Sequence, residues 1–233
     1  MKPIYKPKGA AAEYGDYALN IYTGCPHRCF YCFAPSVLRR DRQTFHTCVT
    51  PRTNIVSETA KQIEREEITG KTIHLCFTCD PYPTGYDTTP TREIIKLLKD
   101  SGNHVQILTK GDGSRDFDLL DGNDLYGITL DGTSNQYRRS NTNLMQDLRD
   151  ANARGVKTWV SFEPVVNDGN VLRYIRLVAP FVDKVKIGKL NYHPSGIDWA
   201  GFGRKAEDLC QSLDVDYYIK ESLRKEMEAS GNG

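Results

Sequence analysis

The sequence predicts an α/β fold in which parallel strands are covered by helices. Short apolar runs alternate with amphipathic runs along all 233 residues, without an internal repeat or a low-complexity segment. A strand followed by a helix recurs about six times. This alternation is typical of parallel strands joined by crossover helices. The length suits one domain with a sizeable core.

Each expected element follows from its residue pattern. Apolar runs bounded by turn residues predict strands, and apolar residues at helical spacing predict helices that often end at Gly. The expected strands are 17–23, 72–78, 104–109, 124–131, 156–165, 183–191 and 215–220. The expected helices are 54–67, 91–102, 143–155, 171–181, 198–213 and 221–229. The segment 111–123 is the weakest connection, because it is short and has the composition of a loop.

We expect residues 1–16 to form an N-terminal tail and residues 17–233 to form a single domain. The first residues contain lysines but no apolar stretch behind them, so they do not predict a secretory signal. No apolar run approaches the ~20 residues of a membrane span. The chain is therefore expected in the cytoplasm, away from membranes, with its seven cysteines reduced.

The charge is unevenly distributed. Residues 1–52 hold eight Lys/Arg and three Asp/Glu, a net charge of +5, whereas the remainder holds 23 and 27, a net charge of −4. The uneven charge can simply reflect a solvated surface with no functional role. The alternative is that the N-terminal part binds an anionic partner. The excess is too small to indicate a basic nucleic-acid-binding domain by charge alone.

Polar residues follow most of the expected strands. In parallel barrels the functional residues gather at the carboxyl ends of the strands. Here those ends carry Cys25, Asp80, Lys110, Thr129, Asp131, Glu163, Lys189 and Asn191. Any one of them could be a cap or a surface group, but together they favour a site.

Three cysteines, Cys25, Cys29 and Cys32, are spaced C-x3-C-x2-C without a fourth cysteine nearby. A structural zinc site needs four ligands, and His27 or His46 could supply the fourth, but the spacing is unusual for zinc. A ferredoxin-like cluster needs four thiolates. Three cysteines within eight residues also argue against simple buried apolar residues. The spacing gives little support to a second cluster formed by Cys48, Cys76, Cys79 and Cys210.

Several stretches match a known pattern across roughly residues 17–220. The three-cysteine motif directly follows the first strand, with Tyr31 before its last cysteine, and (αβ) repetition follows. With these features the chain resembles the radical S-adenosylmethionine (SAM) superfamily. The stretches YTGCPHRCFYCFAP, TCDPYPTGYDTTPTRE, ILTKG, SFEPV and IGKLNY resemble its spore photoproduct lyase-like branch. The chain is also similar in pattern and size to small radical enzymes found as uncharacterised pairs in mobile elements.

The resemblance implies a partial (β/α)6 TIM-like barrel of parallel strands with a short C-terminal strand–helix addition. It implies that Cys25, Cys29 and Cys32 hold a [4Fe–4S] cluster whose open iron binds SAM. Reductive cleavage would give methionine and a 5′-deoxyadenosyl radical, which takes a hydrogen atom from the substrate. The implied partners are an electron donor such as flavodoxin or ferredoxin and a nucleic acid or partner protein.

The resemblance also implies contacts to SAM. Tyr31 would pack by the adenine, Thr78 and Asp80 would meet the methionine amino group, and Lys110 would pair with the carboxylate. Asp80 could equally start a turn before Pro81, and a lysine at a strand end is often solvent-exposed. Further candidates for ribose, sulfonium-side and adenine contacts are Thr129, Glu163, Lys189 and Asn191.

Two departures from the lyase pattern bear on the reaction. Phe33 stands where the lyase has a relay tyrosine, and Phe77 stands where it has a hydrogen-donating cysteine. Cys76 and Cys79 flank that place and are tentative catalytic candidates, although side-chain alternation points a one-residue offset to the opposite face. Burial in the strand is the alternative for both. The departures argue against thymine-dimer reversal.

We therefore expect a radical SAM enzyme of unknown substrate, with nucleic acid or nucleotide as the first candidate for repair or modification. A peptide or partner protein that the enzyme activates or modifies is the alternative. From another class, a non-catalytic zinc or iron–sulfur binding module stays open. The stretch 111–127 hints at a calcium loop but does not match that spacing, so it is interpreted as a solvated loop near the barrel mouth.

Overall fold

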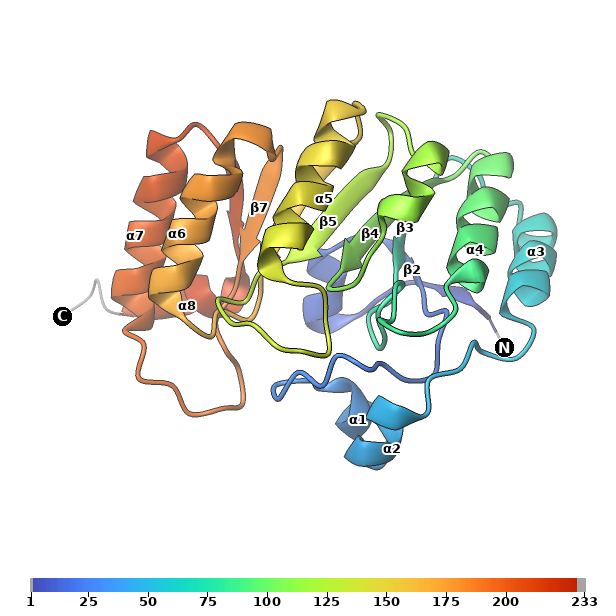
Figure 1. The fold of residues 1–233 in the computed structure, drawn as a ribbon, viewed down its shortest axis with the longest axis horizontal. Helices are drawn as coiled ribbons and strands as arrows, with labels where there is room; N and C mark the ends of the chain where they lie inside the picture. The colour runs from blue at the N-terminus through green and yellow to red at the C-terminus, as the bar shows by residue number, and fades with distance from the viewer. Residues whose placement is uncertain (1, 230–233) are drawn as a thin grey trace.

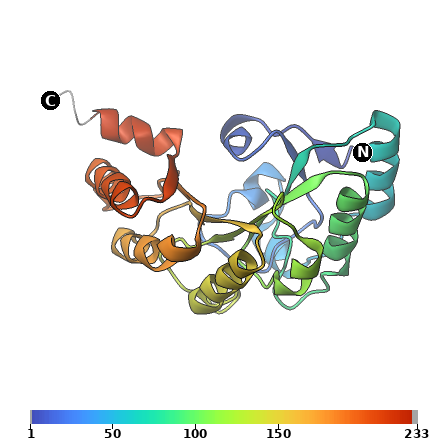
Figure 2. The ribbon, with the colours of Figure 1, turned by 90° about the horizontal axis from the view of Figure 1, so that it is seen from above.

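The fold is a half-open ring of strands with helices on its outer side (Figures 1 and 2). The computed structural model describes residues 2–229. One sheet contains eight strands in the order in which they occur along the chain. The first pair is antiparallel and every later pair is parallel. The expected α/β fold with a partial parallel barrel is confirmed.

The expected strands and helices are present in the expected order, together with elements within residues 1–16 and 34–47 that the sequence did not predict. The strands are β1 Ile4–Tyr5, β2 Tyr17–Leu19, β3 Thr72–Leu75, β4 His104–Thr109, β5 Leu125–Thr129, β6 Lys157–Phe162, β7 Lys184–Ile187 and β8 Asp216–Ile219. The α-helices are α1 Ala34–Val37, α2 Arg42–Thr47, α3 Ile55–Glu66, α4 Thr89–Asp100, α5 Asn141–Ala153, α6 Asp168–Val178, α7 Trp199–Ser212 and α8 Glu221–Ala229. The 3-10 helices are η1 Gly9–Glu13, η2 Ser114–Leu119 and η3 Ala179–Phe181. The weak segment 111–123 thus contains only a 3-10 helix.

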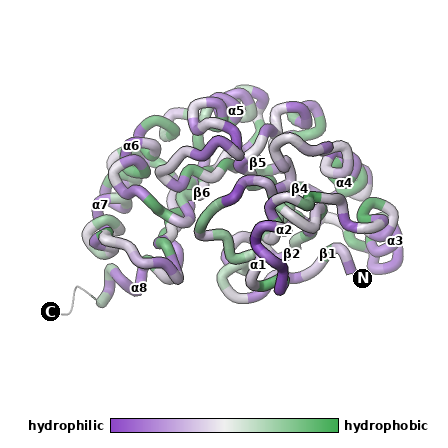
Figure 3. The backbone as a smooth tube through the Cα atoms, turned by 60° about the horizontal axis from the view of Figure 1, so that its bottom comes forward, coloured by the Kyte–Doolittle hydropathy of each residue, from purple (hydrophilic) through white to green (hydrophobic). Residues whose placement is uncertain are grey.

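The hydrophobic core lies between the outer face of the sheet and the helices α3 to α7, which form the outer arc in Figure 3. In α4, Ile94 and Leu98 are completely buried, and Val105 and Ile107 of β4 belong to the same core. Each such side chain contributes about 1.5–3 kcal/mol by leaving water. This packing fixes the strands whose carboxyl ends build the site.

The inner face of the sheet is polar instead. His74 of β3 lies in register with Gln106 of β4, and Ser161 of β6 lies in register with Lys186 of β7. All four are buried. Because alternate residues of a strand face opposite sides, the apolar residues between them point to the helices. The interior of the ring therefore has polar groups that need partners.

The segment before residue 17 belongs to the sheet, although it is expected as a tail. Ile4 in β1 is 3% exposed, and the side chain of Gln62 bonds both its backbone N–H and its carbonyl at 2.9 Å. The helix η1 then crosses the open side of the ring, where Tyr218 donates to Glu13 at 2.8 Å. Lys220 donates to the backbone carbonyl of Ala10 at 3.2 Å. These hydrogen bonds join residues that are far apart in the sequence, so no local sequence pattern predicts them.

Among residues 2–229, no helix is both long enough and apolar enough to cross a membrane.

Candidate functional site

The cysteine loop follows β2 and is fastened by α2. Arg42 donates hydrogen bonds to the carbonyl oxygen of Cys29 at 2.6 Å and to that of Cys32 at 3.2 Å. His46 in the same helix bonds the carbonyl of Cys25 through Nδ1 at 2.8 Å. The N-cap Asp41 accepts from the backbone of α2, which fixes the start of this short helix. The loop backbone is thereby ordered while none of the three thiols is tied up in a disulfide, and the Cys29 thiol makes only a long contact of 4.0 Å to the carbonyl of His27.

The three thiols suit a cluster better than a single zinc ion. All are partly exposed and none forms a disulfide. Among the described residues, their sulfurs do not all lie within 4.8 Å of one another. Four thiolates at about 2.3 Å from one zinc ion would be closer, at about 4 Å from each other. Burial raises the pKa of Cys25 and Cys32, so metal binding must release their protons.

The histidine that could complete a zinc site is engaged elsewhere. His27 Nδ1 lies 3.3 Å from the Asp80 carboxylate, and its Nε2 lies 3.1 Å from Thr84 Oγ1. The remaining sequence candidate, His46, uses one nitrogen for the loop carbonyl. Its other nitrogen is buried without a partner among the described residues. This arrangement provides three cysteines and no committed fourth ligand.

Tyr31 is held across the mouth of the ring by a buried ion pair. Its hydroxyl donates to Asp131 at 2.5 Å, and Arg138 donates to both oxygens of the same carboxylate at 2.6 and 2.9 Å. Burial acts to raise the pKa of Asp131, but the Arg138 bonds and charge and the Tyr31 bond lower it to about 2. Lys110 Nζ lies 5.9 Å from the Tyr31 ring centroid and forms no ion pair with any described residue. An unpaired cation and a fixed ring therefore lie together.

Thr78 and Asp80 differ in how free their side chains are. The Thr78 hydroxyl is buried and has no hydrogen-bond partner among residues 2–229. The Asp80 carboxylate accepts from the backbone N–H two residues on at 2.9 Å, from Thr109 Oγ1 at 2.5 Å and from the Lys110 N–H at 2.9 Å. Together with His27, these donors occupy it fully. The geometry favours the turn role for Asp80 and leaves Thr78 available.

Comparison with known proteins decides the family. The model of the radical SAM superfamily matches residues 19–169. The chain belongs to the radical SAM superfamily. Members use a [4Fe–4S] cluster and SAM and need an electron donor, and the cysteine loop fits that cluster.

Solved structures of spore photoproduct lyase are similar in fold to this radical SAM chain. The lyase complexed with dinucleoside spore photoproduct aligns with a TM-score of 0.68 and 11% identity, covering 92% of this chain and 78% of that one. A double-variant lyase with bound AdoMet and dinucleoside spore photoproduct aligns with a TM-score of 0.59 and 13% identity, covering 90% and 65%. At this identity the likeness shows the fold.

Sequence relatives cover different shares of the chain. An uncharacterized protein of Mycobacterium tuberculosis is 35% identical over 115 residues, covering 46% of this chain and 33% of that protein. An uncharacterized protein of Methanocaldococcus jannaschii is 27% identical over 186 residues, covering 75% and 68%. The match thus spans about a third of the length of the mycobacterial protein.

Cys76 and Cys79 lie away from the inside of the radical SAM barrel. The Cys76 sulfur accepts from the backbone N–H of Ile21 at 3.5 Å, and the Cys79 sulfur accepts from that of Tyr22 at 3.4 Å. Phe77 instead points inward and stacks on the His74 ring with centroids 4.2 Å apart. For Cys76 this agrees with the alternation argument, and the hydrogen bonds favour a structural role over a catalytic one for both cysteines.

Glu163 is the most engaged of the remaining candidates. It pairs with Lys220 at 3.1 Å and accepts a hydrogen bond from the buried Tyr14 hydroxyl. A Cβ on Gly188 would come within 3.0 Å of the Glu163 side chain, so the glycine makes room for it. Tyr14 is missed by sequence reasoning because it falls in the expected tail. The sequence pattern could have identified Lys220 as a site candidate, because it follows the end of a strand as the other candidates do.

The last three candidates divide between the inside and the rim. Thr129 is 2% exposed and lies in register with Ser161 on the inner face. Lys189 forms an ion pair with Glu226 of α8, so its ammonium is drawn to that helix. Among the described residues, the side chain of Asn191 donates only to the backbone carbonyl of Lys189, at 3.3 Å. Thr129 therefore lies with the site, whereas Lys189 and Asn191 lie at the rim.

Proposed function

We propose that this chain holds a [4Fe–4S] cluster on Cys25, Cys29 and Cys32 and cleaves SAM reductively to modify a nucleic acid or nucleotide. The observation that carries the proposal is the loop of three disulfide-free cysteines with its backbone held by Arg42 and His46. When bound, the cluster and SAM supply electron transfer and a 5′-deoxyadenosyl radical. The protein supplies position and a shielded site.

The residues of this chain have distinct tasks in the proposal. Lys110, which has no ion-pair partner among residues 2–229, provides a cation for the methionine carboxylate. The unpartnered Thr78 hydroxyl accepts from the amino group. Tyr31, fixed by Asp131, forms an aromatic wall for the adenine. Glu163 faces the inside of the ring for a hydroxyl contact, oriented by Tyr14.

The substrate class rests on the surface around the loop. Phe30 and Phe33 beside the cysteines are 51% and 54% exposed. The Arg28 guanidinium lies 4.4 Å from the ring centroid of Tyr137. Exposed aromatic and basic groups together suit bases and phosphates of a single strand. The fold neighbour binds a dinucleoside lesion. Because Phe77 fills the inside with a ring that has no hydrogen to donate, we propose modification rather than dimer reversal.

The first experiment tests the cluster. Protein reconstituted anaerobically with iron and sulfide, then given dithionite and SAM, is expected to form 5′-deoxyadenosine, measured by mass spectrometry. Cys29→Ala should lose the product, whereas Cys48→Ala should keep it, because Cys48 is exposed and lies outside the loop. A colourless protein that binds zinc, or equal activity in Cys29→Ala, would contradict the proposal.

A second experiment tests the substrate and the electron donor. Single-stranded oligonucleotides, with reduced flavodoxin or ferredoxin as the donor, should increase 5′-deoxyadenosine formation and acquire a new mass. Phe30→Ala should weaken oligonucleotide binding, whereas Leu177→Ala, a 47% exposed residue on α6, should not. No stimulation by any oligonucleotide, with cluster chemistry intact, would redirect the search to a peptide or partner protein.

A further inference from the structure

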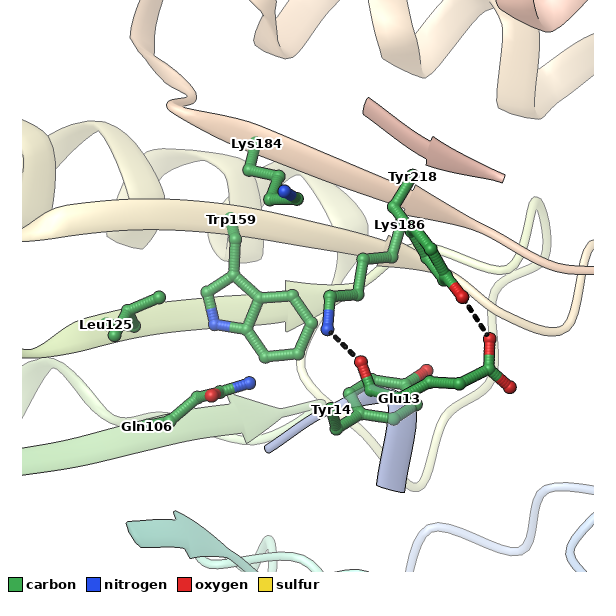
Figure 4. A pocket seen from close by; sticks show the side chains of 8 residues that line it. All are labelled: Glu13, Tyr14, Gln106, Leu125, Trp159, Lys184, Lys186 and Tyr218. Carbon is green, nitrogen blue, oxygen red and sulfur yellow. Dashed lines mark hydrogen bonds between the residues drawn. The ribbon is translucent and has the colours of Figure 1, made fainter. Parts of the chain in front are cut away.

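We propose that the amino-terminal half of the ring contains a second site, which binds a small anion of the carboxylate or phosphate type. A cavity of about 230 Å³ opens there between η1 and the starts of the strands (Figure 4). Its walls include Tyr14, Gln106, Trp159, Lys184, Lys186 and Tyr218. The cysteine loop follows the opposite ends of the strands. The site therefore does not depend on the proposed cofactor chemistry.

Lys186 gives the cavity its preference for an anion. It is 8% exposed, and its ammonium donates to the backbone carbonyl of Glu13 at 2.8 Å. No carboxylate among the described residues forms an ion pair with it. Its flanks are the rings of Tyr14 and Trp159, whose centroids lie 4.5 and 5.4 Å from Nζ. An ammonium has three donors, so two remain, and a buried charge without a counter-ion is costly. An anion in the cavity would accept hydrogen bonds from the two free N–H groups and would neutralise the charge.

Two further polar groups beside the cavity lack partners. Gln106 is 6% exposed, and its amide forms no hydrogen bond with any described residue. His74, its neighbour in register on β3, is 1% exposed, and both ring nitrogens are buried without a partner among residues 2–229. Buried polar groups are nearly always bonded to protein, water or ligand. Gln106, which lines the cavity, therefore offers a donor and an acceptor to a guest held by Lys186, and His74 lies behind it on the neighbouring strand.

The walls and entrance are shaped for a small guest. Trp159 is fixed by its Nε1 hydrogen bond to the carbonyl of Ile107 at 2.9 Å. A Cβ on Gly127 would lie 2.2 Å from that nitrogen, so only glycine admits the indole there. Lys184 at the entrance is 41% exposed and pairs with Asp216 at 3.0 Å. Because that pair is neutral overall, and the Glu13 carboxylate in the lining accepts from Tyr218 and from the backbone of Glu221, the charge that attracts an anion is that of Lys186.

The tryptophans provide a direct measurement of binding. The chain has two, and Trp199 lies in α7, so Trp199→Phe leaves Trp159 in the cavity wall as the reporter. In the reconstituted protein, we titrate inorganic phosphate and, separately, acetate at constant ionic strength, and follow tryptophan fluorescence. A saturable change is expected with at least one anion. Lys186→Met in the same background should weaken it at least tenfold, and Lys205→Met, on the exposed side of α7, should leave it unchanged.

The outcomes separate the alternatives. A response to phosphate alone assigns phosphorylated compounds, and a response to acetate alone assigns carboxylates. No response, a linear response, or one that survives Lys186→Met would mean that Lys186 holds no anion, and would overturn the proposal. If Lys186→Met melts at a much lower temperature, Gln106→Leu replaces it as the test, with the same expected loss of affinity. Since SAM cleavage is not measured, failure here leaves the proposed function untouched.

Discussion

At the scale of single residues, the unusual feature is a cation inside the ring. Burial and the neighbouring charge of Lys220 lower the pKa of Lys186 to about 8. Rings of Tyr14 and Trp159 flank it, and they replace only part of the hydration that a lysine has in water. A positive charge at this place therefore costs stability in the absence of a guest.

This cost predicts how stability depends on pH. Lys186 has a folded pKa of about 8, below its ordinary value of 10.5, so between these values the unfolded chain binds more protons. Unfolding free energy then rises with pH. Relative to Lys186→Met, the native protein should gain up to about 3 kcal/mol between pH 8 and 10.5, at about 1.4 kcal/mol per pKa unit. Urea unfolding of both proteins across this range measures the difference, and a constant difference would disprove the shifted pKa.

Residue by residue, sequence reasoning succeeded where strand geometry alone decides. Alternation turns Cys76, one residue from Phe77, to the opposite face, and the Phe77 ring does stack on the inner His74 while the Cys76 sulfur accepts from Ile21. It does not place Cys79, which is two residues from Phe77 and beyond the end of β3. Sequence reasoning could not show that Asp80 accepts from four donors while the Thr78 hydroxyl has no partner among the described residues, because three of these donors come from other segments of the chain. Arg138 was missed for the same reason. Arg138 matters through its buried ion pair with Asp131, and only the fold brings these two residues together.

At the scale of elements, the short helix α2 orders the cysteine loop. Its residues are adjacent in sequence to the motif, yet the pattern gives no hint that a guanidinium would bind the carbonyls of two cysteines. Gly24 lets the loop approach this helix, because a Cβ there would lie 2.6 Å from the carbonyl of Phe45. The helix therefore lowers the entropy that the loop must lose when metal binds.

Removing this support should weaken cluster binding. Arg42→Leu deletes charge-assisted bonds to the loop and should reduce the iron retained after gel filtration, with the three cysteines unchanged. Arg176→Leu is the matched control, because within residues 2–229 Arg176 donates only to the backbone of its own helix, at 3.2 Å. Equal iron content in both variants would show that the cysteines alone order the loop.

The elements themselves were predictable, and their ends were not. Strand β3 ends at Leu75 rather than at residue 78, because Cys76 has a positive φ of 71° and turns the chain out of the sheet. The expected helix at 54–67 appears as α3 Ile55–Glu66. Residues 1–16 contained two elements that their composition concealed, since β1 is two residues long and η1 is held by contacts to the far end of the chain.

At the scale of the whole molecule, the ring is closed by the N-terminal segment rather than by pairing of its two edge strands. Figure 2 shows η1 and α8 on either side of the opening. Glu13 connects the two sides, because Tyr218 and the backbone of Glu221 both donate to its carboxylate, at 2.8 and 3.4 Å. The contact between η1 and the β8–α8 side, which we call the seam, thus depends on a few hydrogen bonds rather than on apolar packing.

A double-mutant cycle tests this closure. Glu13→Ala and Tyr218→Phe should each destabilise the protein, and together they should lose less than the sum of the single effects. The expected coupling is about 0.5–1.5 kcal/mol in urea unfolding, the range for one hydrogen bond. The pair Lys225→Ala and Glu221→Ala, on the solvent side of α8, should show a smaller coupling. Purely additive effects of the Glu13 and Tyr218 substitutions would mean that the seam bond contributes nothing.

The bond between Glu13 and Tyr218 spans 205 residues, and that between Lys220 and Ala10 spans 210. During synthesis on a ribosome, the first of these partners emerges long before the last. Until β8 leaves the exit tunnel, η1 lacks its partners Tyr218 and Lys220, and the inner lysine of β7 is open to water. The nascent chain can therefore complete its outer helices strand by strand, but its interior stays hydrated until β8 has emerged.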